Sequence, residues 1–241
     1  MTQDPQTSSP NDVRAHLAEV AELAQKRFTE THAMREQALR LSREMVRNSA
    51  NSIRASHRGE FDQARELLDR VTAAARELET LRESQPAVYY AGYVEDAQKE
   101  YVEASSMLAI AQGAVPPGPD QLGVGPAPYL NGLADVAGEL RRYILDSLRR
   151  EDFTRCEELL GVMDEIYTVL VSMDFPDAVT RGLRRGADMV RGVLERTRGD
   201  LTLALRQHRL EERMAGFEDA VEGLQDSVGV LKDVMADQDD G

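Results

Sequence analysis

The placement of proline constrains the fold of this chain more than any other feature of its sequence. The nine prolines lie near the N-terminus at 5 and 10, singly at 86 and 176, and in a cluster at 116, 117, 119, 126 and 128. The long stretches between them carry apolar residues at helical spacing and few runs of β-branched residues. Because proline inside a helix removes a hydrogen bond and clashes with the preceding turn, such stretches favour helices that end at the prolines. The pattern therefore predicts an all-α protein.

The expected helices cover most of the chain. Periodic apolar positions and helix breakers predict helices over 12–57, 60–84, 87–112, 128–149, 152–173 and from 176 past 206. Proline and glycine make 113–127 a flexible loop. We expect one domain over 12–235, built from about six to seven long antiparallel helices. The polar tail 1–11 is expected to be disordered, and 236–241 to form an acidic tail.

Composition excludes several classes of protein. Lys and Arg number 29 against 43 Asp and Glu, a net charge of −14, which argues against simple electrostatic capture of nucleic acid or of an anionic membrane. No apolar run approaches the ~18 residues of a membrane span, and the polar N-terminus contains no apolar core of a secretory signal. The single cysteine excludes a disulfide framework. We expect a cytoplasmic protein without a membrane partner.

Arginine almost replaces lysine among the cations, since the only lysines are Lys26, Lys99 and Lys232. Together with the many carboxylates and the absence of tryptophan, this usage is typical of salt-adapted, halophilic cytoplasmic proteins. Four arginines form a stripe on the first expected helix: Arg40, Arg43, Arg47 and Arg54. This stripe is a candidate nucleic-acid contact, and salt bridges to neighbouring acids are the alternative interpretation.

Paired carboxylates are the one pattern in the sequence that points to catalytic chemistry. The sequence contains no glycine-rich phosphate loop, no His-Glu-x-x-His and no nucleophile elbow, and its four histidines are scattered. Glu100 and Glu103, spaced i,i+3, share one face of the third expected helix. Asp135 and Glu139, spaced i,i+4, share one face of the fourth.

The helix that carries Glu100 and Glu103 has apolar residues on two faces: Val94, Ala97, Tyr101, Ala104 and Leu108 on one, Met107 and Ile110 on the other. Such a helix is buried between neighbours, and unpaired carboxylates at the edge of a packed interior are costly unless they bind a cation. If the third and fourth helices pack together, the four carboxylates converge. Oxygen ligands of this kind suit Mg²⁺ or Mn²⁺ and phosphodiester hydrolysis. The spacing alone leaves a solvated acidic face as the alternative.

The same residues lie in segments that resemble a known family. Glu100-Tyr-Val-Glu-Ala104 and Tyr129-Leu-Asn-Gly-Leu-Ala-Asp-Val-Ala-Gly-Glu-Leu140 are similar to segments of translin-associated factor X, the catalytic branch of the translin superfamily. Looser similarity covers the first helix and a later hairpin, at Leu41-Ser-Arg-Glu44, His57-Arg58, Glu151-Asp-Phe153 and Asp164-Glu-Ile-Tyr167. The resemblance spans about 30–205.

The resemblance implies an all-α fold and assembly into hollow barrels, commonly octamers, that enclose RNA or single-stranded DNA. It also implies a Mg²⁺-dependent endoribonuclease whose catalytic acids are Glu100, Glu103 and Asp135, and Glu139 is added as a further metal ligand. The chain is then expected to act on RNA as a homo-oligomer. A nucleic-acid-binding protein without turnover and a helical scaffold stay open as alternatives.

One stretch departs from the pattern of the family. Where translin has a basic cluster just before the paired glutamates, this chain has an aromatic stretch with Tyr89, Tyr90 and Tyr93. These rings could stack on unpaired bases, each stack contributing about 1–3 kcal/mol. The alternative interpretation is that the tyrosines pack beneath the start of a helix.

Overall fold

The computed structural model describes residues 10–239, and the side chains of 10–218 and 220–224. Within this range the chain forms helices and no strand, which confirms the all-α prediction. The helices are α1 (Pro10–His57), α2 (Phe61–Glu79), α3 (Leu81–Ser84), α4 (Pro86–Tyr89), α5 (Gly92–Ala111), α6 (Pro119–Leu122), α7 (Pro126–Leu148), α8 (Cys156–Val171), α9 (Asp177–Thr180) and α10 (Leu183–Asp239). The long ones, α1, α2, α5, α7, α8 and α10, form the expected bundle.

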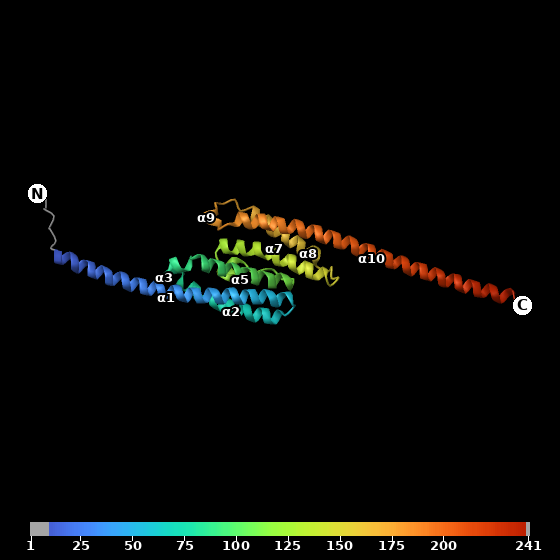
Figure 1. Cartoon of the computed structure of the whole chain (residues 1–241), viewed down its shortest axis with the longest axis horizontal. Coiled ribbons are helices and arrows are strands. Elements are labelled where there is room, and N and C mark those ends of the chain that lie inside the picture. Colours follow the sequence, from blue (N-terminus) through green and yellow to red (C-terminus); the bar gives the residue numbers. More distant parts are fainter. Residues whose placement is uncertain (1–9, 240–241) are drawn as a thin grey trace.

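The long helices stack in layers, with α1 and α2 at one side, α5 and α7 in the middle, and α8 and α10 at the other side (Figure 1). α5 packs against α1, α2 and α7, and α7 packs in turn against α8 and α10. The first part of α1 and the last part of α10 extend beyond the bundle, so the two ends of the chain lie at opposite ends of the molecule (Figure 1).

α5 separates two hydrophobic cores. Its residues Val94, Ala97, Tyr101, Ala104 and Leu108 belong to the core shared with α1 and α2. Its residues Met107, Ile110 and Ala111 belong to the core shared with α7, α8 and α10. This arrangement confirms the expectation that a helix with two apolar faces lies between neighbours. The polar side chains of α5 are therefore confined to the narrow edges between the two cores.

Two of the expected helices are interrupted. The helix expected over 60–84 divides into α2 and α3 at Thr80, whose hydroxyl donates a hydrogen bond to the carbonyl of Glu77 at 2.7 Å. The helix expected over 87–112 divides into α4 and α5, because Ala91 is extended with a ψ of 144°. The loop expected over 113–127 contains the short helix α6.

The last long helix begins later than expected. Pro176 has a ψ of 146° and precedes α9 instead of starting the long helix. Arg181 and Gly182 then take positive φ values of 55° and 91°, a left-handed conformation that ends one helix before α10 begins at Leu183. Residues 1–9 of the tail expected over 1–11 lie outside the described residues, and α10 continues to Asp239 through the acidic segment.

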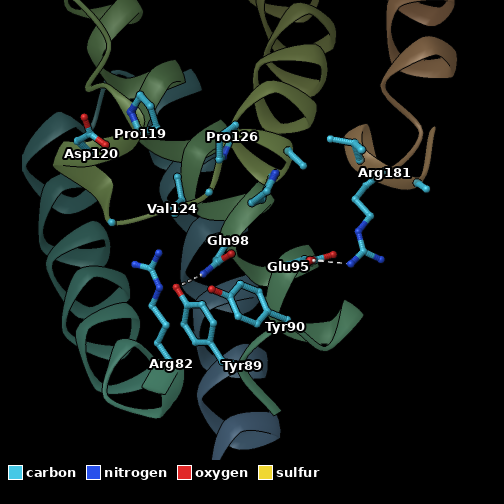
Figure 2. A pocket seen from close by; sticks show the side chains of 16 residues that line it. Arg82, Tyr89, Tyr90, Glu95, Gln98, Pro119, Asp120, Val124, Pro126 and Arg181 are labelled. Carbon is cyan, nitrogen blue, oxygen red and sulfur yellow. Dashed lines mark hydrogen bonds and ion pairs between the residues drawn. The ribbon is translucent and has the colours of Figure 1, made fainter. Parts of the chain in front are cut away.

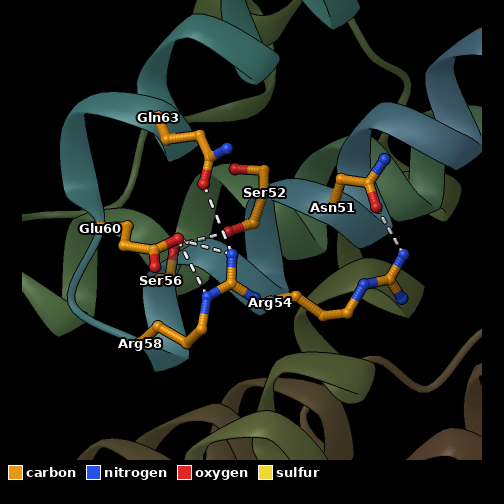
Figure 3. Close-up of polar contacts among 7 residues, drawn as sticks. All are labelled: Asn51, Ser52, Arg54, Ser56, Arg58, Glu60 and Gln63. Carbon is orange, nitrogen blue, oxygen red and sulfur yellow. Dashed lines mark hydrogen bonds and ion pairs between the residues drawn. The ribbon is translucent and has the colours of Figure 1, made fainter.

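The turn between α1 and α2 fixes the position of His57, the last residue of α1. The Arg58 guanidinium donates two hydrogen bonds to one carboxylate oxygen of Glu60, at 2.9 and 2.6 Å (Figure 3). The hydroxyl of Ser52 donates to the carbonyl of Ala64 at 2.9 Å, which ties α1 to α2 on the buried side of the turn.

No helix among the described residues is both long and apolar enough to cross a membrane.

Candidate functional site

The four carboxylates singled out in the sequence line one cavity. Glu100 and Glu103 enter it from α5, and Asp135 and Glu139 enter it from α7. The cavity has a volume of about 450 Å³ and is also lined by residues of α1 and α10, namely Ala50, Ile53, Arg54 and Met189. The packing of α5 against α7 thus brings together two acid pairs that are separated by more than 30 residues in the sequence.

A close approach of α7 to α5 brings the two acid pairs together, and Gly132 allows it. A Cβ atom at Gly132 would lie only 2.7 Å from the Lys99 carbonyl oxygen and 2.7 Å from the Val102 Cβ. Asp135 lies one helical turn after Gly132, and its carboxylate pairs with the Lys99 ammonium at 2.7 Å. The glycine therefore sets the helix spacing at the level of the acids.

Glu103 is the most deeply buried of the four acids, with 8% of its surface exposed. Burial, followed by the charges of Asp135, Glu100 and Glu139, raises its pKa to about 8, against the opposing effect of Lys99. Burial also raises the pKa of Glu100. Burial and the neighbouring charges therefore keep Glu103 protonated near neutral pH, and a bound cation would favour its charged form.

Glu139 differs from the other acids because its carboxylate forms a hydrogen bond with a histidine. His57 Nε2 lies 2.5 Å from Glu139 Oε2. This hydrogen bond lowers the pKa of Glu139, although burial alone would raise it. The His57 side chain is 4% exposed, and its Nδ1 has no hydrogen-bond partner.

Two basic residues at this site were missed in the sequence. Lys99 is one of three lysines and adjoins Glu100, and His57 lies in a segment with family similarity, so each had a weak signal. Their partners, Asp135 and Glu139, lie on a different helix. The spacing of residues along one helix could not identify these pairs.

The oxygen atoms of the four acids are the type of ligand that a hard divalent cation prefers. Four carboxylates offer the oxygen ligands that Mg²⁺ and Mn²⁺ prefer, and three of them raise the pKa of buried Glu103 further through their charges. Among the described residues, however, no group of three His, Cys, Asp or Glu side chains is arranged to hold a metal ion. Asp135 is already paired with Lys99 through one carboxylate oxygen, Oδ2.

The predicted arginine stripe contacts the site through one member. Arg54 lines the cavity and donates to Asn51 at 2.6 Å (Figure 3). Arg40 forms a 3.7 Å ion pair with Glu77. Arg43 and Arg47 are exposed and form no ion pair or hydrogen bond with the described residues. Arg142 of α7 also lines the cavity and adds a second cation that the sequence had not marked as a nucleic-acid contact.

The predicted tyrosines lie apart from the acids. Tyr89 is buried, where its hydroxyl donates to Glu79 at 2.5 Å and accepts from Gln98 at 3.1 Å (Figure 2). Tyr93 packs against the core, and its buried hydroxyl has no partner. Tyr90 alone of the three is widely exposed, with its ring edge-on to Tyr89 at 5.0 Å. Stacking on Tyr89 or Tyr93 would require those rings to leave the core.

Comparisons with known proteins agree on one family. The model of the translin family matches residues 2–197. The uncharacterized protein MJ0175 of Methanocaldococcus jannaschii is 31% identical over 183 residues, which cover 76% of this chain and 81% of that relative. The solved structure of AfC3PO in complex with duplex RNA is 36% identical, with a TM-score of 0.72, over 79% of this chain and 98% of that chain. The structure of apo-NeC3PO, 20% identical with a TM-score of 0.69 over 82% of this chain and 99% of that chain, shows a similar fold.

Proposed function

Since this chain belongs to the translin family, we propose that it is a Mg²⁺-dependent endoribonuclease whose active site is the acidic cavity between α5 and α7. The observation that carries the proposal is that Glu100, Glu103, Asp135 and Glu139 line one cavity. The similarity of the first two and of Asp135 to the acids of the catalytic branch supports the same assignment. The proposed active form is a homo-oligomer, an octameric barrel by resemblance to the family.

RNA is the proposed substrate. A solved structure 36% identical to this chain is AfC3PO bound to duplex RNA, which supports RNA as the ligand here. Arg54 and Arg142 flank the acids and can contact phosphate oxygens through two N–H groups each. Arg43 and Arg47 follow on the exposed side of α1 and are available to bind the backbone of a longer strand. Single-stranded DNA is a second candidate ligand with the same backbone chemistry.

The proposed ligands of Mg²⁺, or of Mn²⁺, are Glu100, Glu103 and Asp135, with Glu139 completing the set. When bound, the cation would supply a Lewis acid that activates water toward a phosphate. Lys99, which pairs with Asp135, would hold that carboxylate in place and would offer an ammonium group to a phosphate oxygen. His57 holds the Glu139 carboxylate in a fixed orientation, as a partner of a metal ligand commonly does.

RNA binding without cleavage is the second candidate function. It is favoured by the Lys99–Asp135 and His57–Glu139 pairs, which satisfy two of the four acids within the protein. In that case the acids are structural, and the arginines alone contact the RNA.

Incubation of the pure protein with labelled RNAs at high KCl, with Mg²⁺, with Mn²⁺ or with EDTA, tests the proposal. We expect cleavage that needs the cation and that is lost in Glu100→Gln. The control Glu83→Gln removes an exposed acid of α3, away from the cavity, and is expected to cleave normally. RNA that is bound but never cut with either cation would support the second candidate.

A further inference from the structure

The last part of α10 extends beyond the bundle (Figure 1), and several of its large apolar side chains are exposed to water. Leu201 is the last buried residue of α10 that belongs to a core. Beyond it, five large apolar side chains are each more than half exposed: Leu203 69%, Leu210 58%, Met214 55%, Phe217 70% and Leu224 66%. Such a stripe is unfavourable in water unless another surface covers it. The segment also lies beyond residue 197, where the match to the family ends.

The apolar positions follow the spacing of a coiled coil. Steps of four and three residues alternate through Leu210, Met214, Phe217, Val221 and Leu224, and the sequence continues the spacing at Val228, Leu231 and Met235. The helix runs without interruption to Asp239. An apolar seam sustained over more than three heptads, about 38 Å of helix, indicates pairing with another helix.

The residue types on the seam favour a coiled coil of two parallel helices. Met214, Val221, Val228 and Met235 occupy the a positions, and Leu210, Phe217, Leu224 and Leu231 occupy the d positions. Valine at a with leucine at d favours a parallel dimer over higher assemblies. The seam has both valines at a and three leucines at d.

The charges beside the seam are complementary between two copies. The g positions Arg206 and Arg213 lie opposite the e positions Glu211 and Glu218 of a parallel neighbour, five residues further along. Both contacts join opposite charges, and the symmetry of a dimer repeats each of them. Arg206, Arg213 and Glu218 form no ion pair or hydrogen bond with the described residues, so they are available for these contacts.

We propose that residues 203–235 of α10 dock against the same segment of a second copy of this chain, forming a parallel two-stranded coiled coil. The coiled coil joins two bundles through a segment outside the family domain. The exposed stripe at the start of α1, which includes Val13, Leu17 and Val20, is the other surface that could cover it.

Cysteine cross-linking of the full chain tests the pairing. In a parallel coiled coil position 214 faces itself, so we expect Met214→Cys to form a disulfide-linked dimer under mild oxidation. Ala215→Cys, on the outer face, should not, and the native Cys156 is buried. The proposal is overturned if Met214→Cys alone stays monomeric on denaturing gels but forms a disulfide with one of two other variants. A link to Leu231→Cys would report antiparallel pairing of α10, and a link to Leu17→Cys would report pairing of α10 with α1. It is equally overturned if no cysteine pair links.

Sedimentation of the full chain gives an independent test. Met214→Glu buries a charge in the seam and is expected to lower the sedimenting mass at concentrations where the wild type is paired. Ala215→Glu adds the same charge on the next residue and should leave the mass unchanged. An unchanged mass for Met214→Glu contradicts the proposal. RNA cleavage is tested separately through the acids of the cavity, which share no residue with the seam.

Discussion

Glu103 links the stability of the protein to its proposed chemistry. Its pKa rises from an ordinary 4.5 to about 8, first because it is buried and then because three other carboxylates lie near it. Between these two pH values the folded protein holds a proton that the unfolded chain releases. The contribution of this group to stability is therefore present below pH 4.5 and is lost as the pH rises through 8.

Replacing Glu103 with glutamine removes this titration. In EDTA, we expect Glu103→Gln to raise the Tm, and to raise it more at pH 8 than at pH 5, because the wild-type side chain is charged only at the higher pH. Thermal unfolding at the two pH values measures the difference. An equal shift at both values would mean that burial does not raise the pKa of Glu103.

The candidate site was partly predictable at the scale of single residues. The spacing of Glu100 with Glu103 and of Asp135 with Glu139 identified four acids that the structure places in one cavity. Lys99 and His57 could not be found in this way, because their partners are set by the packing of separate helices. Tyr89 was instead a candidate nucleic-acid contact in the sequence, but the structure buries it and its hydroxyl bonds to Glu79 and Gln98.

At the scale of helices, the contact between α5 and α7 determines whether the acids meet. Gly132 has no room for a methyl group against Lys99 and Val102. The two apolar faces of α5 were readable from the sequence, whereas the breaks at Thr80 and Ala91 were not, because neither residue is a proline or a glycine. The seam of α10 follows a heptad spacing that is visible in the sequence alone.

Gly132→Ala is expected to force α7 away from α5. We expect a loss of about 1–3 kcal/mol in the free energy of unfolding, as overpacking commonly costs, together with weaker Mg²⁺ binding. Gly161→Ala on α8 is the matched control, since a Cβ there meets nothing within 4 Å. That control should be stabilised by about 0.5–1 kcal/mol, because alanine loses less chain entropy than glycine. Urea denaturation compares the two, and a Gly132→Ala protein as stable as the control would contradict the close approach.

The net charge of −14 is a property of the whole molecule, and it limits how RNA can be bound. A molecule so acidic gains little from general attraction to phosphate. Under the proposed function, binding would depend on the few arginines beside the cavity and on α1, namely Arg43, Arg47, Arg54 and Arg142. The salt adaptation expected from the scarcity of lysine stays a prediction of the sequence.

The salt dependence of RNA affinity reports how many cations take part. For four arginines on a single strand, the slope of log K against log salt is expected to be about −3 per binding site. Arg47→Gln should reduce its magnitude by about 0.7, whereas Arg209→Gln, exposed on the far part of α10, should leave it unchanged. Fluorescence anisotropy across a KCl series measures these slopes. A slope insensitive to Arg47→Gln would remove α1 from the RNA contact.

The proposed cleavage of RNA depends on the acids between α5 and α7 together with a divalent cation. The most direct test is the single-turnover rate of RNA cleavage at saturating Mg²⁺ for wild type, Asp135→Asn and the exposed control Asp69→Asn, with RNA affinity measured in parallel. We predict that Asp135→Asn lowers the rate by about 100-fold or more, while its RNA affinity and the rate of Asp69→Asn stay within about twofold of wild type. Cleavage by Asp135→Asn at the wild-type rate would contradict the proposal that this cavity is the active site.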